Sequence, residues 1–215
     1  LLEGFHLIEE AASSDAEIKE LFVTQRGMKE WGDWLAVNKE ISTFLVSDEV
    51  MTAMSDLPTP QGILAVMTLT SKDTPDFSGG WLLLDNVQDP GNVGTMIRTA
   101  DAFGMAGVLL GKGTADIYST KVLRSMQGSN YHLPVLQKDL AEVIPVMKGK
   151  GFTVYGTELN EEAHALDKVE KTEDFAIIMG NEGQGVSQEI LSLTDQNVYI
   201  PMKGNAESLN VGVAA

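Results

Sequence analysis

The sequence contains no cysteine, few basic residues and no long apolar run. Without cysteine, disulfides, thiolate metal sites and a cysteine nucleophile are excluded, and a reducing compartment such as the cytoplasm fits the composition. No apolar run approaches the roughly 20 residues that cross a bilayer, and no signal-peptide pattern opens the chain. We therefore expect a cytoplasmic protein with no membrane partner.

The shortage of positive charge limits the choice of partners. Among 215 residues, 31 are acidic and 15 are basic, which gives a formal net charge of −16 at pH 7. Affinity for nucleic acid comes largely from Lys and Arg that neutralise phosphates, so the overall charge has the wrong sign for such a partner. Any nucleic-acid function must therefore depend on a local basic patch or on charge that a partner supplies.

Two α/β domains are expected. Short apolar segments in residues 1–70 alternate between strand and helix patterns, with helices at 7–12, 31–37 and 48–54 and strands at 21–23, 44–46 and 63–66. Residues 71–80 (SKDTPDFSGG) are polar and rich in turn formers, which is typical of a linker. Residues 81–215 form the second domain. The chain opens with Leu1 and stops at Ala215 inside an apparent helix, so we expect trimmed ends.

Polar loops follow three apolar strands of the second domain. The strand at 81–84 leads into a loop with Asn92 and a helix with Arg98, the strand at 175–179 into a glycine loop with Glu182, and the strand near Val198 into a loop with Ser208 and Asn210. Ligands of open α/β sheets bind at the carboxyl ends of the strands. On physical grounds alone, Arg98 is about equally explained as a site residue and as a surface charge.

The chemistry open to these loops is narrow. His6, His132 and His164 all lie outside them, so a Ser-His-Asp triad is excluded, and no His or carboxylate cluster has the spacing of metal ligands. We expect no metal. Glu182 has no acidic partner in a neighbouring loop for paired acid–base hydrolysis. What remains is positioning: Arg, Asn and Ser side chains can orient a hydroxyl and stabilise negative charge that develops on it.

The glycine loop at 180–185 does not suit a nucleotide phosphate. Its spacing matches neither G-x-G-x-x-G nor the P-loop, whose Lys-Ser/Thr ending is absent. Glu182 would repel phosphate, so a cationic or neutral ligand fits better.

The best local basic patch combines Lys112 with Lys121 and Arg124, which lie one turn apart on an expected helix at 119–127. An ordinary exposed helix face explains the same residues. If RNA is the partner, we expect these three residues and Lys203 to gather near the site and to offset the acidic charge locally.

Three stretches of the second domain resemble successive motifs of a known family: DNVQDPGNVGTMIRTADAFG, IIMGNEGQGVS and VYIPMKGNAESLNVGVAA. They look like the motifs of the SpoU (TrmH-like) RNA 2′-O-ribose methyltransferases of the SPOUT superfamily, in the same order. Residues 1–70 resemble, less specifically, the ribosomal-protein-L30e-like substrate-binding domain that often precedes that catalytic domain. The resemblance implies a mostly parallel α/β sheet with a deep trefoil knot, S-adenosyl-L-methionine bound bent within the knot, and a homodimer whose interface borders the site.

By motif position, the resemblance places the family's reactive arginine at Arg98 and a second site residue at Asn92. Glu182, Ser208 and Asn210 take the other polar roles. It implies cofactor contacts, largely through backbone around the adenine, at Gly180, Ile200, Leu209, Thr157, Asn181 and Met202. The family's C-terminal helix continues beyond the position of Ala215, so we expect that helix to be truncated here.

The leading hypothesis is therefore S-adenosylmethionine-dependent 2′-O-methylation of a ribose in ribosomal RNA. A tRNA 2′-O-methyltransferase is the first alternative, and the two-domain layout favours rRNA only by family association. A non-catalytic RNA-binding or ribosome-assembly factor on the same scaffold is the second. Retention of Arg98, Glu182, Ser208 and Asn210 together argues against a non-catalytic factor. The lack of cysteine also fits ribose methylation, because methylation at pyrimidine C5 usually needs a thiolate.

Overall fold

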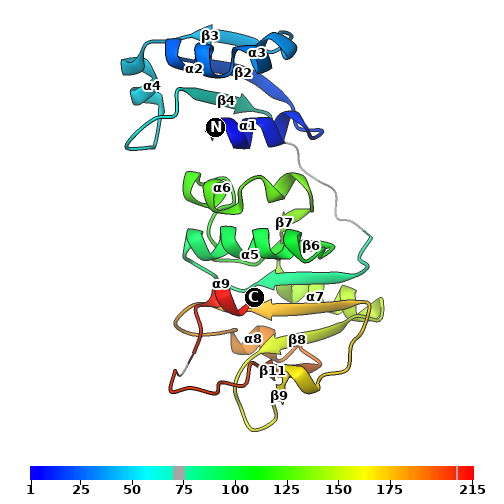
Figure 1. Cartoon of the computed structure of the whole chain (residues 1–215). Coiled ribbons are helices and arrows are strands. Elements are labelled where there is room, and N and C mark those ends of the chain that lie inside the picture. Colours follow the sequence, from blue (N-terminus) through cyan, green and yellow to red (C-terminus); the bar gives the residue numbers. More distant parts are fainter. Residues whose placement is uncertain (70–75, 207) are drawn as a thin grey trace. The chain divides into compact units, whose positions relative to one another are not determined.

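A computed structural model describes residues 1–69, 76–206 and 208–215. The chain divides into two compact units, Leu1–Ser71 and Lys72–Ala215. Figure 1 labels the elements of each unit. Among the described residues, no helix combines the length and apolar character needed to cross a membrane.

The first unit is built on a four-stranded mixed sheet with the order β1-β4-β2-β3. Its elements are β1 (Leu2–Glu3), α1 (Phe5–Ala12), β2 (Ile18–Val23), α2 (Gln25–Glu30), α3 (Gly32–Val37), β3 (Ser42–Leu45), α4 (Asp48–Met54) and β4 (Ile63–Met67). Strand β4 runs antiparallel to β1 and β2, and β2 runs parallel to β3.

Two helices of this unit begin at a residue whose side chain caps them. The Thr24 side chain accepts a hydrogen bond from the backbone N–H of Gly27 at the start of α2, and Ser47 caps α4 in the same way. The helix expected at 31–37 is instead α3, which begins at Gly32. It is separated from α2 by Trp31, whose ring stacks on Phe5 of α1 with the ring centroids 5.1 Å apart.

The second unit contains a seven-stranded sheet in which every described pairing is parallel, with the order β7-β6-β5-β10-β8-β11-β9. The predicted α/β class with a mostly parallel sheet is confirmed. The strands are β5 (Gly80–Leu84), β6 (Gly107–Leu110), β7 (Val135–Gln137), β8 (Thr153–Thr157), β9 (His164–Ala165), β10 (Phe175–Met179) and β11 (Gln196–Tyr199).

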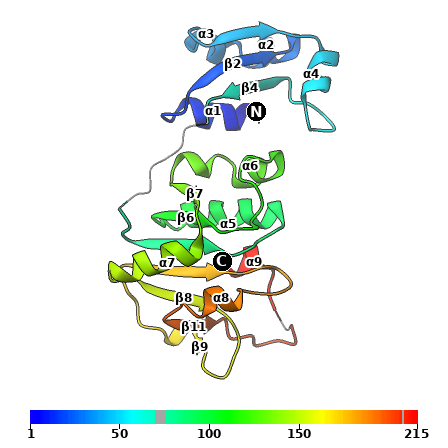
Figure 2. The same ribbon diagram turned by 180° about the vertical axis from the view of Figure 1, so that it is seen from behind.

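Helices cover both faces of this sheet, as the opposite views of Figure 1 and Figure 2 show. One face carries α5 (Pro90–Ala102) and α9 (Val211–Ala214), with α6 (Thr120–Met126) packed on α5; the other carries α7 (Leu140–Gly149) and α8 (Gln188–Leu191). Helices α5 and α6 approach closely at Gly94, where an added Cβ would lie 2.4 Å from the Cβ of Ser125.

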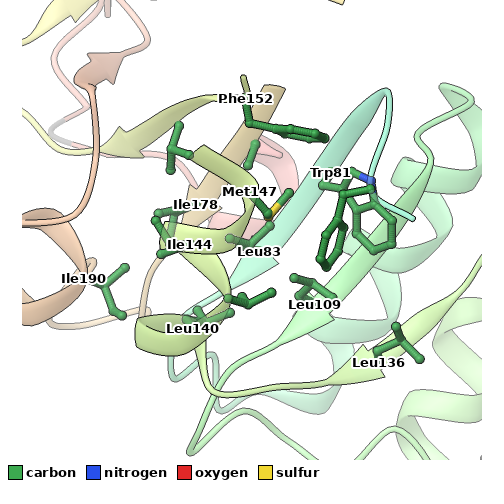
Figure 3. Close-up of a cluster of buried hydrophobic side chains, with 14 of the residues drawn as sticks. Trp81, Leu83, Leu109, Leu136, Leu140, Ile144, Met147, Phe152, Ile178 and Ile190 are labelled. Atoms are coloured by element: carbon green, nitrogen blue, oxygen red, sulfur yellow. The ribbon is translucent and has the colours of Figure 1, made fainter. Parts of the chain in front are cut away.

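The core under α7 and α8 explains why these strands read as continuous apolar runs. Leu83, Leu109 and Ile178 pack there with side chains from both helices (Figure 3). Their neighbours Leu82 and Leu84 are equally buried, and the pleat points them to the other face of the sheet. In a parallel sheet that is covered on both faces, neither face of a strand is exposed, so the strand sequences do not alternate between apolar and polar residues.

Part of the predicted linker belongs to the second unit. Residues 71–75 lie outside the described residues, but Phe77 is buried and packs edge-on against Trp81, with the ring centroids 5.0 Å apart. The backbone N–H of Gly79 donates to the Asp174 carboxylate, and Gly80 is already the first residue of β5. Because this segment is rich in turn formers, its sequence did not indicate that the Phe77 ring is buried.

Two elements of the second unit are short. A 3-10 helix occupies Ser129–Tyr131, and β7 begins only at Val135, directly after Pro134, which has no backbone N–H to donate. Helix α8 spans only Gln188–Leu191. Ser187 is extended and takes the N-cap position of that helix, and Ser192 ends it.

Candidate functional site

The candidate site lies where β5 and β10 end. These strands are parallel neighbours, with Leu84 opposite Met179, so the loops that follow them leave the same edge of the sheet side by side. The first loop leads into α5, and the second is the glycine loop at 180–185. This placement agrees with the general position of ligand sites in open α/β sheets.

Asp89 caps α5 at this edge. Its Oδ1 atom accepts a hydrogen bond from the backbone N–H of Asn92 at 2.9 Å, and Pro90 occupies the first turn. This hydrogen bond, together with the ammonium group of Lys121, lowers the pKa of Asp89 below its ordinary value. Asn92 is the third residue of the helix.

Glu182 reaches from the second loop to the start of α5. Its carboxylate accepts hydrogen bonds from the backbone N–H groups of Gln88 at 3.2 Å and Asp89 at 3.0 Å, and from Asn92 Nδ2 at 3.0 Å. Burial would raise the pKa of Glu182, but these hydrogen bonds outweigh it, and the pKa is lowered. Glu182 is therefore an ionised anchor between two loops.

Asn92 links all three predicted segments. Its Nδ2 faces the Glu182 carboxylate, which can only accept, so its Oδ1 faces Asn210 and accepts from Asn210 Nδ2 at 3.0 Å. The Oδ1 of Asn210 in turn accepts from the backbone N–H of Gly212 at 2.9 Å and caps α9. This series of side-chain hydrogen bonds, which we call the Glu182–Asn92–Asn210 link, joins loops that are far apart in the sequence.

The glycine loop is a compact turn held by Asn181. The Oδ1 of this residue accepts from the backbone N–H groups of Gly183 and Gln184, at 2.9 and 3.1 Å, and its Nδ2 donates to the carbonyl oxygen of Asn86 at 2.9 Å. Gly180 must be glycine, because an added Cβ would lie 2.1 Å from Gly185 C. The side chain of Asn181 thus shapes the loop, and the backbone is what the loop offers to a ligand.

Asp85 is a site residue that the sequence analysis did not identify. Its side chain is buried, with the residue 8% exposed, and its Oδ2 accepts from the backbone N–H of Ser187 at 2.7 Å. The carboxylate thereby takes over the capping of α8, for which the Ser187 side chain makes no hydrogen bond. In the sequence, only its position directly after an apolar strand could have indicated that Asp85 belongs to the site.

The predicted cofactor residues of the segment at 200–210 share an unusual exposure. Ile200, Met202 and Leu209 are 39%, 38% and 42% exposed, although large apolar side chains are normally buried. Thr157, at the end of β8, donates its hydroxyl to the carbonyl oxygen of Ile178 at 2.7 Å. Exposed apolar side chains beside strand-end backbone suit a flat, uncharged ring system.

Arg98 lies on α5, six residues beyond Asn92. Six helical residues correspond to about 9 Å along the axis and about 120° around it, so Arg98 stands apart from the Glu182–Asn92–Asn210 link. Its side chain is exposed and forms no hydrogen bond or ion pair within the described part of the chain. Ser208 is likewise exposed.

Two of the four predicted basic residues lie against the loop that precedes α5. The Nζ atom of Lys121 is 3.4 Å from Asp89 Oδ2. Lys112 belongs to a segment that is tied to the same loop, because the backbone N–H of Ala115 donates to the Val87 carbonyl oxygen at 2.9 Å. Arg124 is exposed one turn beyond Lys121, and Lys203 is exposed in the segment at 200–210.

Lys138 is a further basic residue at this edge that the sequence analysis missed. It directly follows β7, and its backbone N–H donates to the carbonyl oxygen of Leu110 at 3.0 Å. In the described ranges, no group of three or more His, Asp or Glu side chains could hold a metal ion.

The second unit matches the model of the SpoU rRNA Methylase family over residues 81–215, and residues 1–65 match the MRM3-like substrate binding domain. The chain is 42% identical over 219 aligned residues to the 23S rRNA (guanosine(2553)-2′-O)-methyltransferase RlmP of Bacillus subtilis. That alignment covers 100% of this chain and 84% of the relative.

Solved structures agree with this assignment. A putative RNA methyltransferase of the TrmH family from Porphyromonas gingivalis superposes with a TM-score of 0.86 at 31% identity, covering 99% of this chain and 84% of that chain. The SpoU methyltransferase AviRb from Streptomyces viridochromogenes, in complex with the cofactor AdoMet, gives a TM-score of 0.87 at 26% identity with the same coverage.

The expected family, reaction class and cofactor are confirmed by the whole-length relative and by the family model. The chain belongs to the SpoU rRNA methylase family and is an S-adenosylmethionine-dependent RNA methyltransferase.

Proposed function

We propose that this chain methylates the 2′-hydroxyl of a ribose in ribosomal RNA and does so in the cytoplasm. The observation that carries the proposal is the 42% identity, across all of this chain, to an enzyme named for 2′-O-methylation of 23S rRNA. Both units are included in that similarity, which favours the same class of RNA over tRNA. The scarcity of basic residues is offset in part, because Lys112 and Lys138 follow the strands β6 and β7 at the same edge of the sheet and Lys121 of α6 contacts Asp89 in the loop before α5.

The residues at the strand ends fit S-adenosylmethionine. Exposed Ile200, Met202 and Leu209 would contact the adenine, and the backbone at Gly180 and Thr157 would supply hydrogen-bonding groups. The cofactor is a sulfonium cation, so the ionised Glu182 loop gives its charge a favourable neighbour where a phosphate would be repelled. When bound, it supplies an activated methyl group.

The chain's own task is then to hold the ribose hydroxyl and to stabilise the charge that develops on it. We assign this task to Arg98, because its guanidinium is permanently charged and free of partners among the described side chains. With a pKa above about 12, Arg98 is a poor base and a good electrostatic partner for the nascent alkoxide. A nearby RNA phosphate can assist loss of the proton. Ser208 is assigned to orienting the ribose, and Asn92, Glu182 and Asn210 to positioning the loops.

We further propose that the chain acts as a homodimer, with the site at the interface, and that the second unit forms the family's trefoil knot. A dimer gives a role to the separation of Arg98 from the Glu182–Asn92–Asn210 link, since a residue exposed on α5 can serve a site that is completed by a second copy. Sedimentation equilibrium tests the dimer, and mixed dimers of two inactive variants test whether sites are shared between subunits.

The experiment that tests the proposed function is transfer of tritiated methyl groups from S-adenosylmethionine to purified, unmodified rRNA and tRNA, followed by nucleoside analysis. The proposal expects label in a 2′-O-methylated nucleoside from rRNA. Label only in tRNA would replace the substrate class, and no label in any RNA would leave a non-catalytic RNA-binding factor as the correct reading.

A further inference from the structure

An exposed tyrosine, Tyr118, lies on the segment that is hydrogen-bonded to the loop before α5. Tyr118 is 48% exposed, and within the described residues its ring makes no ring contact and its hydroxyl no hydrogen bond. Its backbone N–H donates to Asp116 Oδ1 at 2.9 Å. Tyrosine combines an apolar ring with a polar hydroxyl, which is why it is enriched at binding interfaces.

The backbone around Tyr118 is firmly held against the site. On its N-terminal side, Thr114 donates its hydroxyl to the Leu84 carbonyl oxygen at 3.0 Å, and Ala115 is hydrogen-bonded to Val87. On its C-terminal side, α6 begins at Thr120, and Lys121 of that helix pairs with Asp89, the cap of α5. Tyr118 therefore follows a segment that is hydrogen-bonded to the start of the loop before α5, and it precedes a helix that makes one exposed ion pair with the end of that loop.

The charges near this ring suit an RNA strand. Lys112, Lys121 and Arg124 are exposed on the same loop and helix, and the last two are neighbours three residues apart. The two acidic groups closest in sequence and contact are occupied within the protein: Asp116 accepts from the Tyr118 backbone, and Asp89 holds Asn92 and Lys121. A solvent-facing ring beside exposed cations, of which Lys112 and Arg124 form no ion pair among the described residues, is the arrangement on which unpaired bases stack.

We infer that Tyr118 is a stacking platform for an unpaired nucleobase next to the ribose that is methylated, with Lys112, Lys121 and Arg124 contacting the flanking phosphates. The inference rests on the proposed function, in that RNA is the substrate. It assigns Tyr118 to positioning the substrate, and it predicts that the methylated ribose lies in unpaired RNA.

The test uses the full chain and the shortest 23S rRNA fragment that the wild-type enzyme methylates. Tyr118→Leu keeps apolar volume but removes the aromatic face, and Tyr118→Phe keeps the face. Stacking on one base predicts that Tyr118→Leu raises the KM for RNA by about 5- to 150-fold, while Tyr118→Phe stays within twofold of the wild type. The KM for S-adenosylmethionine should not change, because no described cofactor contact involves this ring.

Two further measurements separate stacking from a structural role. An abasic scan of the fragment should find one position, next to the target, where loss of the base weakens binding to wild type but not to Tyr118→Leu. As a matched control, Arg124→Gln should flatten the dependence of log Kd on log salt concentration by about 0.7, and Tyr118→Leu should leave that slope unchanged.

Loss of the dimer in Tyr118→Leu would assign the ring to subunit contact and overturn the inference, as would an unchanged KM for RNA or an abasic scan without such a position. A wild-type enzyme that methylates no RNA would instead refute the proposed function, so the two failures are distinguishable.

Discussion

Replacing Asn92 with aspartate should uncouple the three loops of the site. The substitution preserves shape but places a carboxylate oxygen where Nδ2 now lies 3.0 Å from Glu182 Oε1. One hydrogen bond to a charged acceptor is lost, worth about 1.5 kcal/mol at a partly exposed position. Repulsion between two carboxylates in water adds about 1 kcal/mol. The arrangement that holds the cofactor loops together is therefore disfavoured by about 2–3 kcal/mol.

That penalty should appear in cofactor affinity. If the linked arrangement is the one that binds S-adenosylmethionine, the apparent Kd rises by the inverse of its population, about 30- to 150-fold. Isothermal titration calorimetry at pH 8 measures this directly. Because two adjacent carboxylates readily share a proton, the defect should shrink as the pH is lowered toward 5. The wild type should show no such recovery, since the pKa of Glu182 is already lowered.

A second substitution provides the control. Adding Glu182→Gln to Asn92→Asp removes one of the two facing carboxylates and lets the Gln amide donate to the new one. The same amide nitrogen then faces the Asp89 N–H, which Glu182 Oε1 now accepts, so affinity should recover only in part. A Kd for Asn92→Asp within twofold of wild type at pH 8 would refute the view that this link organises the cofactor loops. So would a double variant weaker than either single one.

Three other predictions follow from the same geometry. Arg98→Ala should abolish methyl transfer while calorimetry still detects cofactor binding; near-normal turnover would remove Arg98 from the reaction. Gly180→Ala forces a Cβ within 2.1 Å of Gly185 C and should destabilise the catalytic unit by about 1–3 kcal/mol in thermal unfolding, whereas an unchanged melting temperature would contradict the close approach. The folded-state pKa values of Asp89 and Glu182 are lowered, so the stability that these carboxylates contribute is present above their unfolded-state pKa values. That contribution is lost as the pH falls through the folded-state pKa values. Melting temperatures should therefore drop below about pH 5, and they should drop less steeply in Glu182→Gln.

The sequence was sufficient to predict the sheet and its loops. Apolar runs such as residues 81–84 and 175–179 can be buried on both faces only in a covered parallel sheet, and the polar turns after them mark its ligand-binding edge. Local signals of this kind reach a few residues along the chain. The end of α5 has a local signal of the same kind, because Gly104 follows it with a positive φ of 69°.

The remaining features depend on contacts between distant residues. The Asn210–Asn92 hydrogen bond spans 118 positions and the Asp85–Ser187 bond spans 102, and no periodicity encodes either. Strand β9 has two residues, too few to form a pattern, and its pairing with β11 alone defines it. Phe77 could not be recognised as a core residue either, because its neighbours in the sequence are turn formers. Tertiary packing nevertheless buries its ring.

The central claim is that this chain puts a methyl group on one ribose of ribosomal RNA, and mapping of 2′-O-methylated positions in 23S rRNA tests it most directly. The map would be compared between cells with the gene, cells without it, and cells that carry the Arg98→Ala variant. The account predicts one ribose methylation that disappears with the gene and returns with the wild type but not with Arg98→Ala. Identical maps in all three strains would contradict it.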